Sequence, residues 1–346
     1  MDASSVTVLI ASPLEPRYVE RIKQVSLRLD VLYEPELLGT PRYAADHDIV
    51  PQRTPTQEAA MRSMLARAEV MFDFERTHLH DLLTVAPRLR WVQSTSSGVG
   101  ELLRRHGLCD TDLIVTNAAG IHAIPLTEFC LMVMLMAVKR AKHSQWLQQQ
   151  RHWERFHSTT LHGKTLGIVG LGAIGRHLAH QARTLGMTVH GVKATLPTDD
   201  LPAQYSVDYL WHDAQLAEVL PLLDFVVACL PLIPQTVHRF GPAEFALMKP
   251  SAYFINIGRG QTVNELALID ALHRQCIAGA ALDVVAHEPL APDSPLWALP
   301  NVLISPHSAA TVDTENERLT ELFCDNLQRY LTGQPLRNVI DKQRGY

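Results

Sequence analysis

Short apolar runs alternate with stretches of helical periodicity in the first third of the chain. Apolar residues three or four positions apart predict helices at 15–27 and 57–67. Runs rich in Val, Ile and Phe predict strands between them, at 6–10, 69–72, 90–93 and 113–115. This alternation is typical of a parallel sheet with helices on both faces. The segment 35–55, which carries Pro41 and Pro51, predicts an irregular surface excursion.

The rest of the chain repeats the alternation on a larger scale. A long helix is predicted at 125–151, with Pro125 favourable as its first residue. A final helix at 311–331 carries a single apolar stripe. Six strands are predicted between these helices, at 165–169, 188–192, 224–229, 252–257, 278–282 and 302–304. The predicted fold class is therefore α/β, with two doubly wound parallel-sheet domains.

Composition limits the partners of such a fold. The 346 residues, of which 47% are hydrophobic, suffice for two cores. A formal net charge of -5 without a run of Lys or Arg gives no reason to expect nucleic acid or an anionic membrane as a partner. The longest apolar stretch, 129–138, is much shorter than the ~20 residues that span a bilayer. Small molecules remain as the expected partners.

The N-terminus and the cysteines indicate where the protein resides. No basic region precedes the apolar run at 6–10, so the N-terminus does not resemble a signal peptide. The five cysteines lie singly, without a CxxC pair, which argues against a disulfide framework and against a thiolate metal site. We therefore expect a cytoplasmic protein with reduced thiols.

A glycine motif follows the predicted strand at 165–169. Gly170, Gly172 and Gly175 have GxGxxG spacing, with Ala173 and Ile174 between the last two. The first glycine permits a tight turn, the second allows backbone amides to approach a pyrophosphate, and the third lets helix and strand pack closely. A glycine-rich turn without a ligand is the other interpretation. The strands that follow favour a dinucleotide site.

The end of the next predicted strand bears on the choice of cofactor. An NAD site of this type usually has Asp or Glu there, which accepts hydrogen bonds from the adenosine ribose. This chain has Lys193, whose charge would neutralise a 2′-phosphate, and Thr195 adds a hydroxyl donor. The sequence therefore favours NADP. The other interpretation is a solvated lysine in an enzyme that uses either cofactor, so NAD stays possible.

Ionisable residues follow three of the later strands. Arg259 follows 252–257, Glu288 and Asp283 follow 278–282, and His307 follows 302–304. Each alone is more often structural than catalytic. Because ligands of open α/β sheets bind outside the carboxyl ends of the strands, we expect these residues to converge on one site.

Together these residues suit the reduction of a 2-keto acid. A planar guanidinium, that of Arg259, can bind the substrate carboxylate and polarise the carbonyl. The imidazolium of His307 can supply the proton that the developing alkoxide needs. Glu288, bonded to the other ring nitrogen, would fix the tautomer and favour the protonated ring. We predict Arg259, Glu288 and His307 as catalytic residues.

The chain resembles the D-isomer-specific 2-hydroxyacid dehydrogenase family over nearly its whole length. The resemblance rests on the glycine motif and on short stretches within the C-terminal half of the chain. The segments around Ser97 and Asn117 are also similar to the family. The matching stretches are 170–175, 230–232, 255–260, 282–289 and 305–307. The family implies hydride transfer between NAD(P)H and a small D-2-hydroxy acid or its 2-keto acid.

The resemblance also assigns binding residues. It implies that Asp283 contacts the nicotinamide side, and that Ser97 and the backbone near Gly98 and Val99 hold the substrate carboxylate. Two departures are Lys193, in place of the usual acidic residue, and Gly100, where an acidic or amide residue is common. Further residues expected to line the cofactor, beside the glycine motif, Lys193 and Thr195, are Leu230, Pro231, Ile257, Arg259 and His307.

The family further implies a domain arrangement. A flavodoxin-like substrate domain is expected at 1–121 together with 312–346, and a Rossmann-type dinucleotide-binding domain at 122–311. A homodimer through the nucleotide domain is also implied.

Other functions stay open from the sequence. A nucleotide-sensing, corepressor-like binding protein could share these residues, as could an enzyme that oxidises formate or phosphite. His78 and His80 suggest a metal site, but we interpret them as the start of a surface helix and predict no metal. The residues also leave the acid undecided among glyoxylate, hydroxypyruvate, pyruvate and a bulkier branched acid.

Overall fold

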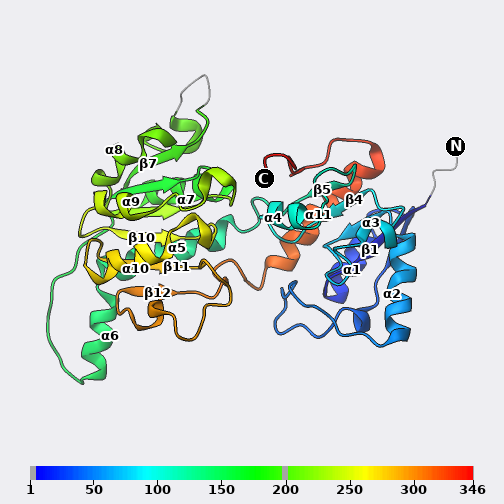
Figure 1. The fold of residues 1–346 in the computed structure, drawn as a ribbon, viewed down its shortest axis with the longest axis horizontal. Coiled ribbons are helices and arrows are strands. Elements are labelled where there is room, and N and C mark those ends of the chain that lie inside the picture. Colours follow the sequence, from blue (N-terminus) through cyan, green and yellow to red (C-terminus); the bar gives the residue numbers. More distant parts are fainter. Residues whose placement is uncertain (1–4, 197–201, 346) are drawn as a thin grey trace. The chain divides into compact units, whose positions relative to one another are not determined.

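The computed structural model describes residues 5–196 and 202–345 and divides into two compact units. The first unit comprises Met1–His122 and Thr311–Tyr346, and the second comprises Ala123–Ala310. Each unit is built on its own parallel sheet, with helices beside it (Figure 1). The predicted α/β class with two parallel-sheet domains is therefore confirmed.

The first unit has a five-stranded sheet in the order β2-β1-β3-β4-β5, with every pair parallel. This is the flavodoxin-like order, with the change of direction between β1 and β3. Its strands are β1 (Val6–Ile10), β2 (Leu29–Leu32), β3 (Val70–Phe72), β4 (Trp91–Gln93) and β5 (Ile114–Thr116). Its helices are α1 (Pro16–Lys23), α2 (Pro55–Arg67), α3 (Leu82–Val85), α4 (Gly100–Arg105) and α11 (Glu315–Thr332).

The second unit has a seven-stranded parallel sheet in the order β12-β11-β10-β9-β6-β7-β8. This is the Rossmann order with one further strand at the β12 edge. Its strands are β6 (Thr165–Val169), β7 (Thr188–Lys193), β8 (Tyr209–His212), β9 (Phe225–Ala228), β10 (Tyr253–Asn256), β11 (Gly279–Leu282) and β12 (Val302–Ile304). Its helices are α5 (Ala123–Val138), α6 (Ala141–Gln149), α7 (Ala173–Thr184), α8 (Leu216–Val219), α9 (Pro242–Leu247) and α10 (Glu265–His273).

The strand register in the second unit brings the carboxyl ends of its strands level. The residues that face one another in this row are Val192, Val169, Ala228, Asn256, Leu282 and Ile304. The loops that leave the sheet after this row therefore begin side by side, although they are far apart in sequence.

Two strands were missed by the sequence analysis, and one predicted helix is two. The missed strands β2 and β8 are sheet edges whose residues are mostly only partly buried, so their apolar pattern is weak. The helix predicted at 125–151 is divided into α5 and α6. Arg140 adopts a left-handed backbone (φ 52°) between them, and such a residue cannot continue a right-handed helix. None of the described helices is both long enough and apolar enough to cross a membrane.

The C-terminal helix α11 completes the core of the first unit. Its apolar stripe buries Leu319, Phe323 and Leu327 completely. The ring of Phe323 lies 5.2 Å from that of Phe72 and 5.3 Å from that of Trp91, measured between centroids. The stripe predicted from the sequence thus packs against strands β3 and β4, which come more than two hundred residues earlier.

We expect Phe323→Ala to destabilise the first unit by about 3 to 5 kcal/mol, because it removes a fully buried ring and leaves a cavity. Denaturant unfolding followed by circular dichroism measures the change. The matched control is Glu321→Ala on the same helix, whose half-exposed side chain should matter by less than about 0.5 kcal/mol. Equal midpoints for the two variants would contradict this packing.

Candidate active site

The glycine motif forms the turn between β6 and α7. Gly170 has φ +107°, and a Cβ on it would collide with the carbonyl oxygen of Cys229. A Cβ on Gly175 would collide with the carbonyl oxygen of Gly170. Packing of the chain therefore explains both glycines. At Gly172, by contrast, a Cβ would meet no described atom within 4 Å, so this glycine leaves open space at the N-terminus of α7. Open space at a helix N-terminus is what a pyrophosphate site requires.

Lys193 is the last residue of β7, as its predicted role requires. Its side chain is partly buried, and the ammonium lies 5.6 Å from the centroid of the Tyr205 ring. A cation over an aromatic face is attracted by the ring quadrupole, so Tyr205 helps to place the charge. Thr195, two residues on, is exposed.

The loop after β10 is held tightly between its neighbours. A Cβ on Gly258 would lie 2.7 Å from the carbonyl oxygen of Leu230, in the loop after β9. A Cβ on Gly260 would collide with the carbonyl oxygen of Val285, in the loop after β11. Arg259 lies between these two glycines, so its backbone is fixed by the loops on both sides. Leu230 and Pro231 therefore lie next to the loop formed by Ile257, Gly258 and Arg259.

Two further side chains fix the Arg259 backbone. Asn256 donates to the carbonyl oxygen of Arg259 over 3.2 Å and accepts from the amide of Gly258 over 3.0 Å. The hydroxyl of Thr262 donates to the same Arg259 oxygen over 2.6 Å. The sequence analysis gave Asn256 no role. The sequence could have indicated a role for Asn256, because this residue lies in the Asn-Ile-Gly-Arg-Gly stretch that resembles the family.

His307 and Glu288 come together at the same edge of the sheet. The Nδ1 of His307 lies 2.8 Å from Oε2 of Glu288, and Oε1 of Glu288 accepts from the amide of Val285 over 3.2 Å. His307 has a left-handed backbone (φ 54°), and its amide donates to the carbonyl oxygen of Asp283 over 2.8 Å. Both partners are thus anchored to the loop after β11.

The pair shifts the pKa of each partner in opposite directions. The hydrogen bond to Glu288 raises the pKa of His307, although burial and the charge of Arg259 oppose the rise. Burial would raise the pKa of Glu288, but the hydrogen bond and charge of His307 outweigh it and lower that pKa. The arrangement therefore favours imidazolium beside carboxylate, which is a proton donor with a fixed orientation.

Asp283 is buried and joins two loops. Its Oδ1 accepts from the hydroxyl of Ser305 over 2.8 Å and from the amide of Ala309 over 2.9 Å. These bonds tie the end of β11 to the segment on both sides of His307. The role of Ser305 was not predicted, and the predicted contact of Asp283 with a nicotinamide stays a prediction.

The predicted substrate loop belongs to the first unit and follows β4. The carbonyl oxygen of Ser97 accepts from the side-chain amide of Asn117 over 2.9 Å. Gly98 is exposed, whereas Val99 is buried and immediately precedes α4. A Cβ on Gly100 would collide with the backbone of Gly345, so the C-terminal segment leaves no room for a side chain at this position.

The interpretation of His78 as part of a surface helix start is wrong. His78 is buried, and its ring bonds to Asp81 over 3.1 Å and to Glu58 over 2.6 Å. His80 is the exposed residue of the two. Among the described residues, no group of three or more His, Cys, Asp or Glu side chains could hold a metal ion.

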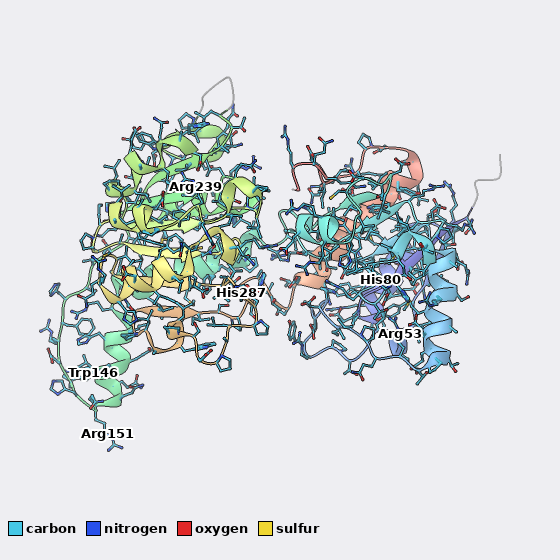
Figure 2. All side chains as sticks on the ribbon, viewed as in Figure 1. Arg53, His80, Trp146, Arg151, Arg239 and His287 are labelled. Carbon is cyan, nitrogen blue, oxygen red and sulfur yellow. The ribbon has the colours of Figure 1, made fainter. Side chains whose placement is uncertain are left out.

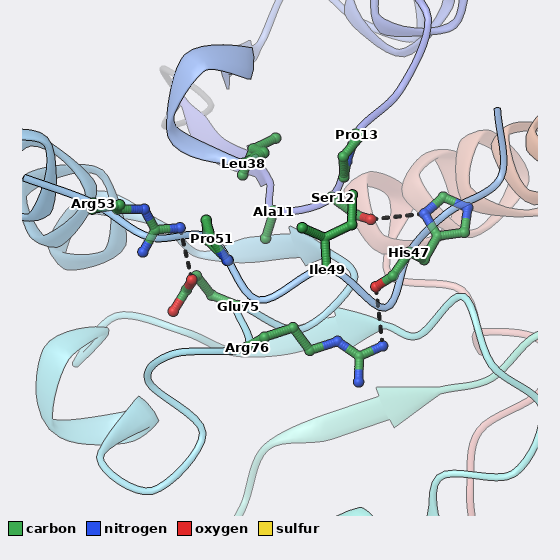
Figure 3. A pocket seen from close by; sticks show the side chains of 10 residues that line it. All are labelled: Ala11, Ser12, Pro13, Leu38, His47, Ile49, Pro51, Arg53, Glu75 and Arg76. Carbon is green, nitrogen blue, oxygen red and sulfur yellow. Dashed lines mark hydrogen bonds and ion pairs between the residues drawn. The ribbon is translucent and has the colours of Figure 1, made fainter. Parts of the chain in front are cut away.

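A small pocket lies beyond the carboxyl ends of β1 and β3 in the first unit (Figure 3). Its volume of about 10 Å³ holds at most about one water molecule. Its polar groups bond to one another, as Ser12 does to His47 over 2.7 Å and Arg53 to Glu75 over 2.8 Å. The pocket is thus too small for a keto acid.

Comparison with known proteins identifies the family. Residues 131–309, more than half of the chain, match the family model described as D-isomer specific 2-hydroxyacid dehydrogenase, NAD binding domain. A glyoxylate/hydroxypyruvate reductase B of Klebsiella pneumoniae is 35% identical over 76% of this chain and 81% of its own length. A glyoxylate reductase of Aeropyrum pernix is 32% identical over 76% and 79%.

Solved structures share the whole fold. A D-isomer specific 2-hydroxyacid dehydrogenase family protein from Aeromonas salmonicida is 29% identical, with a TM-score of 0.81 over 98% of this chain and 100% of that one. A D-isomer specific 2-hydroxyacid dehydrogenase from Xanthobacter autotrophicus, in complex with NADPH and MES, is 26% identical, with a TM-score of 0.78 over 99% and 100%. The chain therefore belongs to the D-isomer specific 2-hydroxyacid dehydrogenase family, whose members are NAD(P)-dependent oxidoreductases.

Proposed function

We propose that this enzyme reduces small 2-keto acids of the glyoxylate and hydroxypyruvate type to D-2-hydroxy acids, with NADPH as the preferred cofactor. The observation that carries the proposal is the bonded pair of His307 and Glu288 at the same sheet edge as Arg259. The relatives named glyoxylate/hydroxypyruvate reductase support the substrate class. They do not favour the alternative of a nucleotide-sensing corepressor.

Three side chains carry the chemistry. The guanidinium of Arg259 binds the substrate carboxylate and polarises the carbonyl that is reduced. The imidazolium of His307 gives its Nε2 proton to the alkoxide oxygen, and Nδ1 stays bonded to Glu288. The carboxylate of Glu288 keeps the ring oriented and stabilises its positive charge.

The second unit holds the cofactor, which supplies the hydride when bound. The turn around Gly172 receives the pyrophosphate, and Lys193 with Thr195 receives the 2′-phosphate. The relative from Xanthobacter autotrophicus, which was solved with NADPH, supports this preference. The other residues proposed to contact the cofactor are Gly170, Ala173, Ile174, Gly175, Leu230, Pro231, Ile257, Arg259, Asp283 and His307.

The first unit supplies the substrate loop. Ser97, Gly98 and Val99 lie at the carboxyl end of β4, where ligands of parallel sheets bind. We assign 1–121 with 312–346 as the substrate domain and 122–311 as the dinucleotide-binding domain. The contact between this loop and the substrate carboxylate is part of the proposal.

The proposed assembly is a homodimer through the second unit. The helix α6 and the loop after it extend away from the sheet of that unit (Figure 1). Trp146 and Arg151 lie on this arm (Figure 2), and Trp153 beside them is 96% exposed. Aromatic side chains of this kind are enriched at interfaces. A monomeric mass in light scattering would contradict the assembly.

The proposed location is the cytoplasm. The free cysteines fit a reducing cytoplasm, and export of the protein would contradict that location.

The test of the function is a spectrophotometric screen of 2-keto acids with NADPH and NADH in parallel. We expect turnover with glyoxylate and hydroxypyruvate. We expect His307→Ala to lower kcat by roughly 10² to 10⁴ while NADPH still binds, because only the proton donor is lost. His287→Ala is the matched control from the neighbouring loop. Near-normal turnover in His307→Ala would refute the proposed role.

The pH dependence should follow the charge of the pair. Reduction needs imidazolium, and Glu288 raises the pKa of His307, so activity should persist below this raised pKa and fall as pH rises through it. In Glu288→Gln the falling limb of kcat/KM should move to lower pH, because the neutral amide no longer stabilises the imidazolium. An unmoved limb would show that Glu288 does not set this pKa.

Lys193 should decide the cofactor. Its contact with a 2′-phosphate should contribute about 1 to 2 kcal/mol, which is roughly a five- to thirtyfold preference for NADPH in kcat/KM. Salt should weaken the preference, because the side chain is only partly buried. We expect Lys193→Asp to favour NADH. The matched control, Lys164→Asp, should leave the ratio of kcat/KM values unchanged. If Lys193→Asp also leaves it unchanged, Lys193 serves only its contact with Tyr205.

A further inference from the structure

A chain of hydrogen bonds reaches the substrate loop from two distant segments of the first unit. The hydroxyl of Ser97 lies 3.1 Å from Nδ1 of His122, and Nε2 of His122 lies 3.0 Å from Oε1 of Glu315. His122 precedes α5, and Glu315 is the first residue of α11. The two residues are 193 positions apart in sequence, so only the fold brings them to the loop.

The two residues that form the second of these hydrogen bonds are largely buried. The side chains of His122 and Glu315 are 12% and 10% exposed, and Oε2 of Glu315 is buried without a hydrogen-bond partner among the described residues. A buried carboxylate with one unbonded oxygen is costly, so its single bond to His122 contributes strongly to where the ring sits. The acidic residue also lies in the first turn of α11, where the helix dipole favours a negative charge.

The carboxylate fixes the direction of the bond at Nε2. A carboxylate only accepts, so Nε2 of His122 carries a proton and donates to Glu315. At Nδ1 the direction follows the charge of the ring, because a neutral ring accepts from the Ser97 hydroxyl and an imidazolium donates to the Ser97 oxygen. In both cases His122 holds the Ser97 side chain.

Hydrogen bonds from other residues also hold the backbone of the substrate loop, and His122 adds a hydrogen bond to the Ser97 side chain. The backbone of the loop is bonded at the Ser97 oxygen by Asn117 and at the Ser96 oxygen by the amide of Ala118. The same segment, 117–122, therefore supplies all three contacts. The turn at Gly98, to which the family resemblance assigns the substrate carboxylate, follows directly.

We propose that His122 is a positioning residue of the substrate site. Held by Glu315, it fixes the Ser97 side chain and keeps the 97–99 turn in the shape that receives the carboxylate of a 2-keto acid. This inference rests on the proposed function, because it assigns a task within the same site.

Three substitutions at one position separate positioning from simple packing. His122→Asn places an amide where Nδ1 was and keeps the reach to Ser97. His122→Gln places its amide where Nε2 was and keeps only the reach to Glu315. His122→Leu removes both bonds but fills similar space. The readouts are KM and kcat for glyoxylate with NADPH, and the dissociation constant of NADPH from fluorescence.

We expect His122→Gln and His122→Leu to raise KM about five- to thirtyfold, and His122→Asn to raise it by no more than about threefold. In all three, kcat and the NADPH dissociation constant should stay within about threefold of the unaltered enzyme, since uniform substrate binding is lost and the reacting groups are intact. Glu315→Gln, which keeps an acceptor for Nε2, should behave like His122→Asn.

The control is His78→Asn, another buried histidine of the first unit, whose ring bonds to Glu58 and Asp81. It should leave KM unchanged. Equal KM values for the Asn and Gln variants, an unchanged KM in His122→Leu, or a parallel change in KM, kcat and NADPH binding would each overturn the inference. So would a rise in KM in the control. Absence of keto-acid reduction by the unaltered protein would instead contradict the proposed function itself.

Discussion

The hydrogen bond between His307 and Glu288 depends on the level ends of strands β11 and β12. Leu282 and Ile304 face each other in the register, so the loops that follow them start side by side. Asp283 then bonds to the His307 amide through its carbonyl oxygen and to Ser305 through its carboxylate. A donor and an acceptor that come from different loops are thereby held 2.8 Å apart. The raised pKa of His307 follows from this geometry.

The other loops of the candidate site in the second unit begin at the same edge of the sheet. The loops after β6, β9 and β10 begin in the same row, and glycines at their closest approaches let backbone pack against backbone. Gly170, Gly175, Gly258 and Gly260 are explained by contacts within the chain, whereas Gly172 faces open space. Contacts within the chain therefore explain the first four glycines, and they do not explain Gly172.

The sequence predicted the α/β class and most strands because parallel strands are buried on both faces and give continuous apolar runs. It missed β2 and β8, because their residues are partly buried or exposed and include the polar Asp30 and His212, so neither strand shows such a run. The break at Arg140 was missed because a left-handed residue without glycine carries no local signal. Arg259, Glu288 and His307 could be proposed from the sequence because each follows a recognisable strand. His122 could not, because its partner Glu315 approaches only in the folded first unit.

The most direct measurement is the titration of His307 by NMR in protein labelled with ¹⁵N-histidine. The signal is assigned by its loss in His307→Ala. In the unaltered protein we expect an imidazole that stays protonated to a higher pH than an ordinary histidine, and in Glu288→Gln one that loses its proton at lower pH. A ring that titrates like an ordinary histidine in both proteins would contradict the view that this pair creates the proton donor.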